Sequence, residues 1–426
     1  MLDINYILEK REEVKKLLEK KGFEADIDEL CLMIEAKRVL QKKVEDNRAM
    51  QNKLSKSVGE VKKTGGDVKE IFLKVKELAS SIKDDEEKLK KYEEDINLIY
   101  VALPNLPDDD LLSGGKENNK EIYRYKDQPK FSFPIKNHVE LAEELGLIDY
   151  VRGAKVSGSG TWFYTGLGAR LEWALLNFFI NTHLNDGFEM IIPPHILNYQ
   201  SGFTAGQFPK FEEDIFVLKD VEPFKFLLPT AETALVNFHR DEIIDGSELP
   251  KKYFAYTPCY RKEAGSYRSE ERGMIRGYQF NKVEMVEYTK AEDSDRAFDE
   301  LVNKAKFLIE SLGLHFRMSK LAAGDCSHAM ARTYDLEIYL PSLDIYKEVS
   351  SVSNARDYQS RRGLMRYKDE NGKILYMHTL NGSGLATSRI FPALLEQCQN
   401  EDGSVTIPEV LRPYMGNISV LKKIKK

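Results

Sequence analysis

The sequence lacks the features of membrane-spanning and secreted proteins. None of its apolar runs approaches the ~18 residues that a membrane-spanning helix requires. The first residues, MLDINYILEKREE, contain no charged segment followed by an apolar one, so we expect no signal peptide. The four cysteines form no Cys-x-x-Cys pair, which argues against a disulfide framework and a structural zinc site. A reduced, cytoplasmic location and no association with membranes are therefore expected. The cysteines are Cys31, Cys259, Cys326 and Cys398.

Two common nucleotide-binding motifs are also missing. The chain has no G-x-x-x-x-G-K-[ST], which excludes a P-loop, and no G-x-G-x-x-G dinucleotide signature. Its formal net charge of -6 gives no general preference for nucleic acid, although a net charge averages over local basic patches. With 426 residues, of which 42% are hydrophobic, the chain is long enough for two or three packed domains.

The N-terminal part, residues 1–103, contains no proline and has the apolar spacing of helices. Apolar side chains recur every three or four residues on both sides of the polar stretch KKTGGD (62–67), as in helices that pack along one seam. Gly65 and Gly66 supply a flexible turn between the two halves. We therefore predict an antiparallel helical hairpin with a coiled-coil-like seam, about 45 Å long at 1.5 Å per residue.

The charges of this predicted hairpin are unevenly distributed. Between residues 35 and 78, twelve lysines and arginines stand against seven acids, an excess of five positive charges. The acids DDEE at 84–87 reverse this balance towards the base of the hairpin. A solvated coiled-coil surface explains the pattern, and so does an outer arm that binds a phosphate backbone. The residues leave both interpretations open.

A change of composition divides the chain after residue 103. Residues 104–118 are rich in proline, acids and glycine and are predicted to link an N-terminal domain, 1–103, to a larger domain, 119–426. In the larger domain, strand-like runs such as FKFLLPT, KVEMVEYT and DLEIYLP alternate with helical patterns at 171–185 and 295–313. Regular β-α-β units are few, so we predict an α+β fold with a largely antiparallel sheet flanked by helices.

Four short segments of the larger domain carry residues suited to nucleotide chemistry. In YRKEAG, where a predicted strand ends, Arg261 has a planar fork of donors suited to phosphate or carboxylate. The Arg-x-Glu pattern that it forms with Glu263 is a weak signal alone, because most such pairs are surface ion pairs. In YKEVSSVSNARDYQSRR, Glu348 and Ser351 supply the hard oxygen ligands that Mg²⁺ prefers. TLNGSGLATSR has small residues that let a backbone approach a ligand, or that form an ordinary turn before a helix. In PTAE, Thr230 and Glu232 either orient a polar substrate or cap a helix.

Taken together and in order, these segments resemble the seryl-tRNA synthetases, a family of class II aminoacyl-tRNA synthetases. The resemblance covers nearly the whole chain, from MLDINYILEK and the helical arm to the C-terminal end. It is carried by GQFPKFEEDIF, LLPTAET, YRKEAG, RGMIRGYQFNKVE, KEVSSVSNARDYQSRR, TLNGSGLA and DGSVTIPEVLRPYMG. It implies an antiparallel-sheet class II catalytic domain, an N-terminal tRNA-binding domain with a long helical hairpin, and a homodimer formed through residues 187–194. It also implies an ATP-dependent serine–tRNA ligase that makes seryl-adenylate and transfers the seryl group to the 3′ end of tRNA-Ser.

The resemblance also implies roles for individual residues. Arg261, Arg389 and Glu348 are the expected catalytic residues: Arg261 contacts the α-phosphate and the serine carboxylate, and Arg389 contacts the γ-phosphate. Phe280 and Arg389 are expected to sandwich adenine, and Glu263 to read its amine. Glu348 and Ser351 are expected to hold Mg²⁺. The complete ATP set is Arg261, Lys262, Glu263, Phe280, Glu348, Val349, Ser350, Ser351 and Arg389. The serine set is Thr230, Ala231, Glu232, Arg261, Glu284, Asn381 and Ser383.

Four positions depart from the family pattern. Tyr278 stands where histidine is usual, Ala205 replaces a threonine and Ser388 replaces a glycine beside Arg389. Pro392 falls inside the helix expected after TLNGSGLA, so we predict a kink or a later start of that helix. These departures leave two alternatives: a paralogue that serves a specialised pathway or another acceptor, and a non-catalytic binder. The intact charged residues argue against a binder, and the retained arm favours tRNA as the acceptor.

Overall fold

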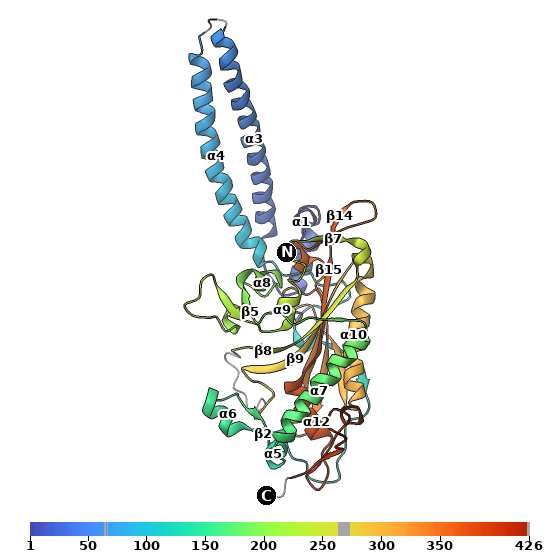
Figure 1. The fold of residues 1–426 in the computed structure, drawn as a ribbon. Helices are drawn as coiled ribbons and strands as arrows, with labels where there is room; N and C mark the ends of the chain where they lie inside the picture. Colours follow the sequence, from blue (N-terminus) through green and yellow to red (C-terminus); the bar gives the residue numbers. More distant parts are fainter. Residues whose placement is uncertain (64, 66, 263–272, 424–426) are drawn as a thin grey trace. The chain divides into compact units, whose positions relative to one another are not determined.

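The structure is a computed structural model that describes every residue except 64, 66, 263–272 and 424–426 (Figure 1). It divides into two compact units. Unit 1 comprises Met1–Glu19 and Phe23–Leu103, and unit 2 comprises Lys20–Gly22 and Pro104–Lys426. This division does not delimit a linker, so the limits 104–118 stay a prediction. In the part of the chain that the structure describes, no helix has both the length and the apolar character needed to cross a membrane.

Unit 1 is built on a long helical hairpin. Two short helices, α1 (Ile4–Glu9) and α2 (Arg11–Lys20), precede α3 (Ile27–Lys63) and α4 (Lys69–Ala102), which lie side by side in opposite directions (Figure 1). Gly65 in the turn has φ +76, a conformation that glycine adopts without a steric penalty. The predicted hairpin is confirmed. Its helices have 37 and 34 residues, which at 1.5 Å per residue is roughly 50–55 Å and longer than expected.

Unit 2 is organised around an eight-stranded sheet with the order β1-β10-β11-β12-β15-β9-β8-β4. All neighbouring strands are antiparallel except β4 and β8, which pair in parallel. The predicted α+β fold with a largely antiparallel sheet is therefore confirmed. The strands are β1 (Lys120–Tyr125), β4 (Glu189–Met190), β8 (Lys251–Tyr260), β9 (Gln279–Thr289), β10 (Phe316–Lys320), β11 (Arg332–Leu340), β12 (Ile345–Asn354) and β15 (His378–Ala386).

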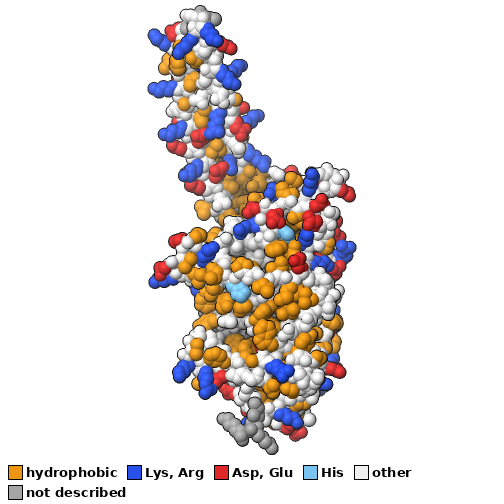
Figure 2. All heavy atoms as spheres, viewed as in Figure 1, with side chains coloured by type: hydrophobic (Ala, Val, Ile, Leu, Met, Phe, Trp, Pro, Cys, Tyr) orange, Lys and Arg blue, Asp and Glu red, His pale blue; other side chains and the backbone are white. Residues whose placement is uncertain are grey.

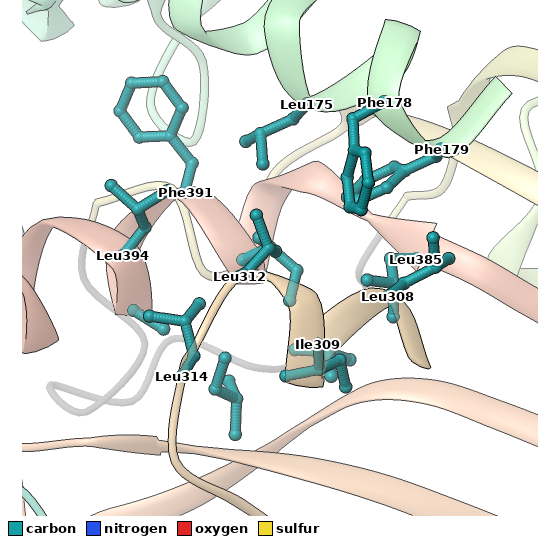
Figure 3. Close-up of a cluster of buried hydrophobic side chains, with 14 of the residues drawn as sticks. Leu175, Phe178, Phe179, Leu308, Ile309, Leu312, Leu314, Leu385, Phe391 and Leu394 are labelled. Atoms are coloured by element: carbon teal, nitrogen blue, oxygen red, sulfur yellow. The ribbon is translucent and has the colours of Figure 1, made fainter. Parts of the chain in front are cut away.

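One face of this sheet is covered by α7 (Gly166–Asn185), α10 (Ser294–Ser311) and α12 (Thr387–Gln397). Their buried side chains meet those of the strands in the main hydrophobic core, part of which Figure 3 shows around Leu312 and Phe391. Because α10 and α12 carry apolar residues at helical spacing, each can bury one face on the sheet. This core holds the strands in place, and it thereby positions the side chains on the opposite face of the sheet.

Alternation along the central strands gives the sheet one apolar and one polar face. In β9, Val283 and Met285 point into the main core, so Lys282 and Glu284 point to the opposite side. In β15, Leu380 belongs to the core, whereas Asn381 and Ser383 lie on the polar side. Farther along β9, Val286 and Tyr288 pack in a second hydrophobic cluster with α9 (Ala231–Leu235). This cluster therefore covers part of the polar face, and the polar side chains of β9 and β15 lie together beside it.

The remaining elements surround this polar region and the ends of the sheet. The additional helices are α5 (His138–Glu144), α6 (Tyr150–Ser157), α8 (Tyr199–Thr204) and α11 (Tyr358–Gly363). The additional strands form small sheets: β2 (Ile148–Asp149) with β3 (Phe163–Tyr164), β5 (Ile196–Asn198) with β6 (Lys225–Leu227), β7 (Ile243–Asp245) with β13 (Arg366–Lys368) and β14 (Ile374–Tyr376), and β16 (Val405–Thr406) with β17 (Val420–Leu421).

Pro392 does not delay its helix. The helix α12 begins at Thr387, two residues before Arg389, and continues past Pro392 to Gln397. The predicted alternative of a later helix start is therefore wrong. Arg389 lies in the first turn and Pro392 beyond it, so the proline removes the backbone hydrogen bond to the carbonyl group of Ser388 without ending the helix.

Candidate active site

A cavity of about 290 Å³ opens on the polar face of the sheet. Its walls come from segments far apart in the sequence: the ends of β8 and β9, the bulged part of β12, the middle of β15 and the first turn of α12. Eleven of the predicted site residues line it. They are Thr230, Glu232, Arg261, Phe280, Glu284, Glu348, Val349, Ser351, Asn381, Ser383 and Arg389.

At the floor of the cavity, four polar side chains form a connected group. The ammonium group of Lys282 lies 2.5 Å from Oε2 of Glu284 and donates to Oγ1 of Thr230 at 2.6 Å. Asn381 donates from Nδ2 to Oε1 of Glu284 at 3.0 Å. Antiparallel register places Glu284 opposite Ser383 on the neighbouring strand, so these groups share one small area. The carboxylate of Glu284 is therefore held in place by one ion pair and one hydrogen bond.

A second carboxylate, Glu232, faces the same floor. Its Oε1 accepts a hydrogen bond from Nε2 of Gln359 at 3.1 Å. Burial raises the pKa of Glu232 to about 7, and the nearby charge of Glu284 adds to this rise, whereas Lys282 opposes it. Two buried carboxylates therefore stand against one buried ammonium group. A ligand that carries a positive charge restores the balance, which is the requirement for binding the α-ammonium group of an amino acid.

The hydroxyl of Ser383 is available to a ligand. Its oxygen is buried, and among the described residues it has no hydrogen-bond partner. Buried polar atoms are nearly always hydrogen-bonded, so an unpaired hydroxyl on a cavity wall indicates a partner that is supplied by a ligand. Ser383 lies beside Glu284 and Asn381, where a small polar side chain would fit.

The strand β15 reaches this position through an unusual backbone. Its register with β9 shifts between Ser383 and Ala386, which marks a β-bulge. Inside the bulge, Leu385 has φ +82 although it is fully buried and not glycine. Such conformations are unfavourable and persist where the surroundings fix them, often at functional sites. Gly384 is tightly enclosed, because a Cβ atom there would lie 2.4 Å from Nε2 of His183.

At one rim of the cavity, an arginine is held against an aromatic ring. The strand β8 ends at Tyr260, so Arg261 leaves the sheet beside β9. Its Nε donates to the carbonyl oxygen of Pro229 at 3.2 Å, and its guanidinium carbon lies 5.1 Å from the centroid of the Phe280 ring. This hydrogen bond uses Nε, and Arg261 lines the cavity, so its two outer nitrogens remain for a phosphate or carboxylate.

A β-bulge brings the two proposed metal ligands to the same side of β12. In a regular strand, residues three apart face opposite sides, so Glu348 and Ser351 would diverge. The register with β11 pairs Glu337 with Glu348 but Leu336 with Ser350, which inserts Val349 as an extra residue. As a result, both Glu348 and Ser351 line the cavity.

The oxygen groups of this bulge fit a divalent cation. Ser351 donates its hydroxyl hydrogen to Oδ1 of Asp335 at 2.6 Å, which leaves lone pairs of the serine oxygen for a cation. Burial raises the pKa of Asp335 well above its usual range, and the charge of Glu348 adds to this effect. A carboxylate and a hydroxyl form the all-oxygen set that Mg²⁺ prefers when it also binds phosphates and water.

Arg389 closes the opposite rim. It is in the first turn of α12, and its Nη1 donates to the main-chain oxygen of Glu348 at 2.6 Å. The same nitrogen lies 3.9 Å from Oε2 of Glu348, which is about half exposed. Arg389 and Phe280 both line the cavity, as the expected adenine sandwich requires.

The structure does not bring every expected residue to the cavity. Ser350 faces away from it and donates its hydroxyl hydrogen to the carbonyl oxygen of Ser383 at 2.7 Å. Ala231 is fully buried in the hydrophobic cluster of α9, and Lys262 is half-buried outside the cavity wall. Glu263 lies outside the described residues. The cavity also contains Lys282 and Arg276, which the sequence analysis missed, and Ser388, which it named only as a departure from the family pattern; Asp335 lies behind the cavity. Lys282 was recognisable, because it is two residues from Glu284 in an alternating strand.

A second cavity of about 340 Å³ adjoins the first. The two share six lining residues, among them Thr230 and Glu232, so they meet beside the floor that holds the carboxylates. The second cavity extends to Gln207 and His328. The site therefore has room for a further reactant next to the group bound at the floor.

Comparison with known proteins identifies the family. Residues 1–107 match the seryl-tRNA synthetase N-terminal domain, and residues 216–398 match the class II tRNA synthetase core domain for G, H, P, S and T. The sequence is 55% identical over 421 residues to Serine--tRNA ligase 2 of Clostridium acetobutylicum, covering 98% of this chain and 99% of that protein. The chain belongs to the seryl-tRNA synthetase family.

Solved structures of this family have the same fold as the chain. The seryl-tRNA synthetase of Pyrococcus horikoshii, complexed with ATP, superposes with a TM-score of 0.93 at 31% identity over 100% of both chains. The cytoplasmic serine-tRNA ligase of Naegleria fowleri, in complex with AMP, has a TM-score of 0.89 at 26% identity and covers 100% of this chain and 99% of that one. Both relatives were therefore solved with an adenine nucleotide.

The raised pKa of Glu232 predicts a pH dependence of serine activation. Below pH 7 Glu232 is mostly neutral and attracts an ammonium group less, so kcat/KM for serine is expected to rise with pH along a curve with an apparent pKa near 7. The measurement is serine-dependent ATP–pyrophosphate exchange between pH 6 and 8. Glu232→Gln should lower kcat/KM and flatten the curve. An unchanged curve in Glu232→Gln would show that another group titrates.

Proposed function

We propose that this protein is a serine–tRNA ligase, which activates serine with ATP and transfers the seryl group to the 3′ end of tRNA-Ser. One observation carries the proposal: a single cavity combines a floor of two carboxylates with a rim of two arginines. The floor suits the ammonium group of an amino acid, and the rim suits phosphates. Membership of the seryl-tRNA synthetase family supports the assignment of this reaction to the cavity.

In the first step, a carboxylate oxygen of serine attacks the α-phosphorus of ATP, and the bond between that phosphorus and the leaving pyrophosphate breaks. Glu284 and Glu232 hold the ammonium group of serine, and Ser383 and Asn381 lie where its hydroxyl would be bound. Arg261 contacts the reacting carboxylate and the α-phosphate, where charge develops, and Arg389 contacts the γ-phosphate. Catalysis consists of positioning and charge stabilisation, without a covalent enzyme intermediate.

In the second step, a ribose hydroxyl of the terminal adenosine of tRNA attacks the carbonyl carbon of seryl-adenylate, and AMP leaves. The second cavity adjoins the floor on the side of Gln207 and His328, so a nucleoside can approach the serine carbonyl there. Glu348 and Ser351 would hold Mg²⁺, which supplies charge neutralisation for the triphosphate. Phe280 and Arg389 hold the adenine of ATP between them.

The protein is also proposed to act as a homodimer through the region of residues 187–194. Strand β4 forms an edge of the main sheet, and Ile192, just after it, is 83% exposed. Met190 in β4 and Trp173 in α7 add exposed apolar surface, and Figure 2 shows hydrophobic side chains gathered on this unit's visible face. An open sheet edge with apolar neighbours is the type of surface that a second copy covers.

The helical hairpin of unit 1 is proposed to bind the phosphate backbone of tRNA. Ion pairs between its helices, Lys37–Glu93, Lys43–Asp85 and Arg48–Glu86, lie in its basal half. The outer part, from residue 53 to 76, carries seven lysines against three acids, and these lysines are exposed. An excess of exposed cations suits a phosphate backbone that is recognised mainly by charge and shape.

The proposed reaction predicts serine-dependent ATP–pyrophosphate exchange and charging of tRNA-Ser. Arg261→Ala is expected to lower the exchange kcat/KM about 10²–10³-fold, since it removes a donor from the developing charge. Arg124→Ala, on the sheet edge strand β1, removes an exposed arginine and should have no effect. Exchange without tRNA charging would indicate a paralogue with another acceptor. The absence of exchange would indicate a binder.

The basic hairpin predicts a salt-dependent contribution to tRNA affinity. Lys53, Lys56 and Lys74 changed together to Gln should reduce the slope of log affinity against log salt by roughly 2, because about one counterion is released per phosphate contact. The matched control changes Lys83, Lys90 and Lys91 of the basal half to Gln, with the same loss of charge. Equal slopes in both variants would refute the proposed contact.

The exposed sheet edge predicts the oligomeric state. Sedimentation is expected to give twice the 49.0 kDa of one chain, and Ile192→Glu combined with Met190→Glu should give one chain, because buried carboxylates oppose the interface. Leu343→Glu places one such carboxylate at an exposed leucine in the loop between β11 and β12 and should leave the dimer intact. A monomeric wild-type protein would contradict this part of the proposal.

A further inference from the structure

A buried carboxylate joins the two segments that carry the proposed adenine-binding residues. Glu172 belongs to α7, and its side chain is only 3% exposed. Its Oε1 accepts a hydrogen bond from Nδ2 of Asn281 at 2.7 Å and another from Oγ1 of Thr387 at 2.5 Å. One oxygen atom of α7 therefore connects strand β9 with the first turn of α12.

Each of these donors lies close in sequence to a residue of the cavity wall. Asn281 directly follows Phe280 in β9, and Thr387 lies two residues before Arg389 in α12. Phe280 and Arg389 line the cavity, whereas Glu172 lies behind it. A displacement of either donor is therefore transmitted over one or two residues to the ring or to the guanidinium group.

Further contacts hold the two donors in place. Asn281 is fixed at its other end, since its Oδ1 accepts from the hydroxyl of Tyr256 at 3.2 Å. The ring of Tyr256 packs against that of Trp173, the next residue of α7, with centroids 5.7 Å apart. Thr387 is fully buried and also donates, over a longer distance of 3.3 Å, to the main-chain oxygen of Asn281, which is itself partly exposed. Removal of Glu172 as the acceptor would break the two shorter hydrogen bonds, so both segments would lose the atom of α7 to which they are tied.

The hydrogen bonds from Asn281 and Thr387 do not require Glu172 to be charged. Burial raises the pKa of Glu172 to about 7, while the hydrogen bonds from Thr387 and Asn281 oppose the rise. No cationic side chain is among the groups that influence its pKa. Both donors converge on a single oxygen, and a carboxamide oxygen can accept both in the same way. The contact thus depends on an acceptor of this length and shape.

We propose that Glu172 is a positioning residue that sets the separation of Phe280 and Arg389, and thereby the width of the slot that receives adenine. This inference rests on the proposed roles of Phe280 and Arg389 in ATP binding. It goes beyond those roles, because it assigns to α7, a helix that does not touch the nucleotide, a part in nucleotide affinity. Serine, which binds at the floor with Glu284 and Asn381, should be unaffected.

The test separates ATP binding from serine binding in ATP–pyrophosphate exchange. Glu172→Met, which removes the acceptor but keeps the length, is expected to raise KM for ATP about tenfold, while KM for serine stays the same. Thr387→Val removes one donor from the other side and should act in the same direction. Glu172→Gln and Thr387→Ser retain the hydrogen bonds and should restore the wild-type KM. Calorimetric titration with AMP, without serine, measures nucleotide affinity in the same variants independently of catalysis.

A matched control separates positioning from loss of stability. Glu396 is a fully buried carboxylate near the other end of α12, where it accepts hydrogen bonds from His138 and Ser342. Glu396→Gln should lower the melting temperature but leave KM for ATP unchanged. If Glu172→Met and Thr387→Val lower the melting temperature and leave KM for ATP unchanged, the inference is overturned. Absence of exchange in the wild-type protein would instead overturn the proposed function.

Discussion

The two-sided character of the central sheet underlies the whole of unit 2. Strands β9, β12 and β15 each place alternate side chains in the core beneath α7, α10 and α12, and the intervening ones on the opposite face. Because the helices fix the apolar face, the polar face cannot slip by one residue without burying charges in the core. This constraint puts Glu284 opposite Ser383, and it holds the floor of the cavity to one arrangement.

The charges of these residues determine which ligand groups the cavity can bind. The floor holds Glu232 and Glu284 but one ammonium group, that of Lys282, so it is one positive charge short when both carboxylates are ionised. Arg261 and Arg389, at the rim, are placed for groups of the opposite sign. A zwitterionic amino acid and a polyphosphate satisfy these two regions at once. Burial makes both preferences stronger than they would be in water.

Much of this organisation was predictable from local patterns. The helical hairpin follows from apolar spacing and the Gly65 turn, and the antiparallel sheet follows from short strand-like runs without regular β-α-β units. Positions such as Arg261 and Arg389 were identified by resemblance, and the structure places both on one cavity. Ser350 and Ala231 lie next to true wall residues in sequence, but they face away from the cavity. The motifs did not reveal this, because Ser350 follows the bulge at Val349 and Ala231 lies in a helix that packs on a hydrophobic cluster, and both features depend on the tertiary structure.

By itself, the amino-acid sequence determined the elements, their order and the residue types that the chemistry requires, since these depend on local spacing and composition. Tertiary structure decided which of those residues act together. The bulge at Val349 turns Glu348 and Ser351 to the same side, and the contact of Glu172 with Asn281 and Thr387 joins three distant segments. Such outcomes depend on strand register and on packing between segments more than 100 residues apart in the chain. No local pattern encodes them, because each partner satisfies the other only after the core has formed.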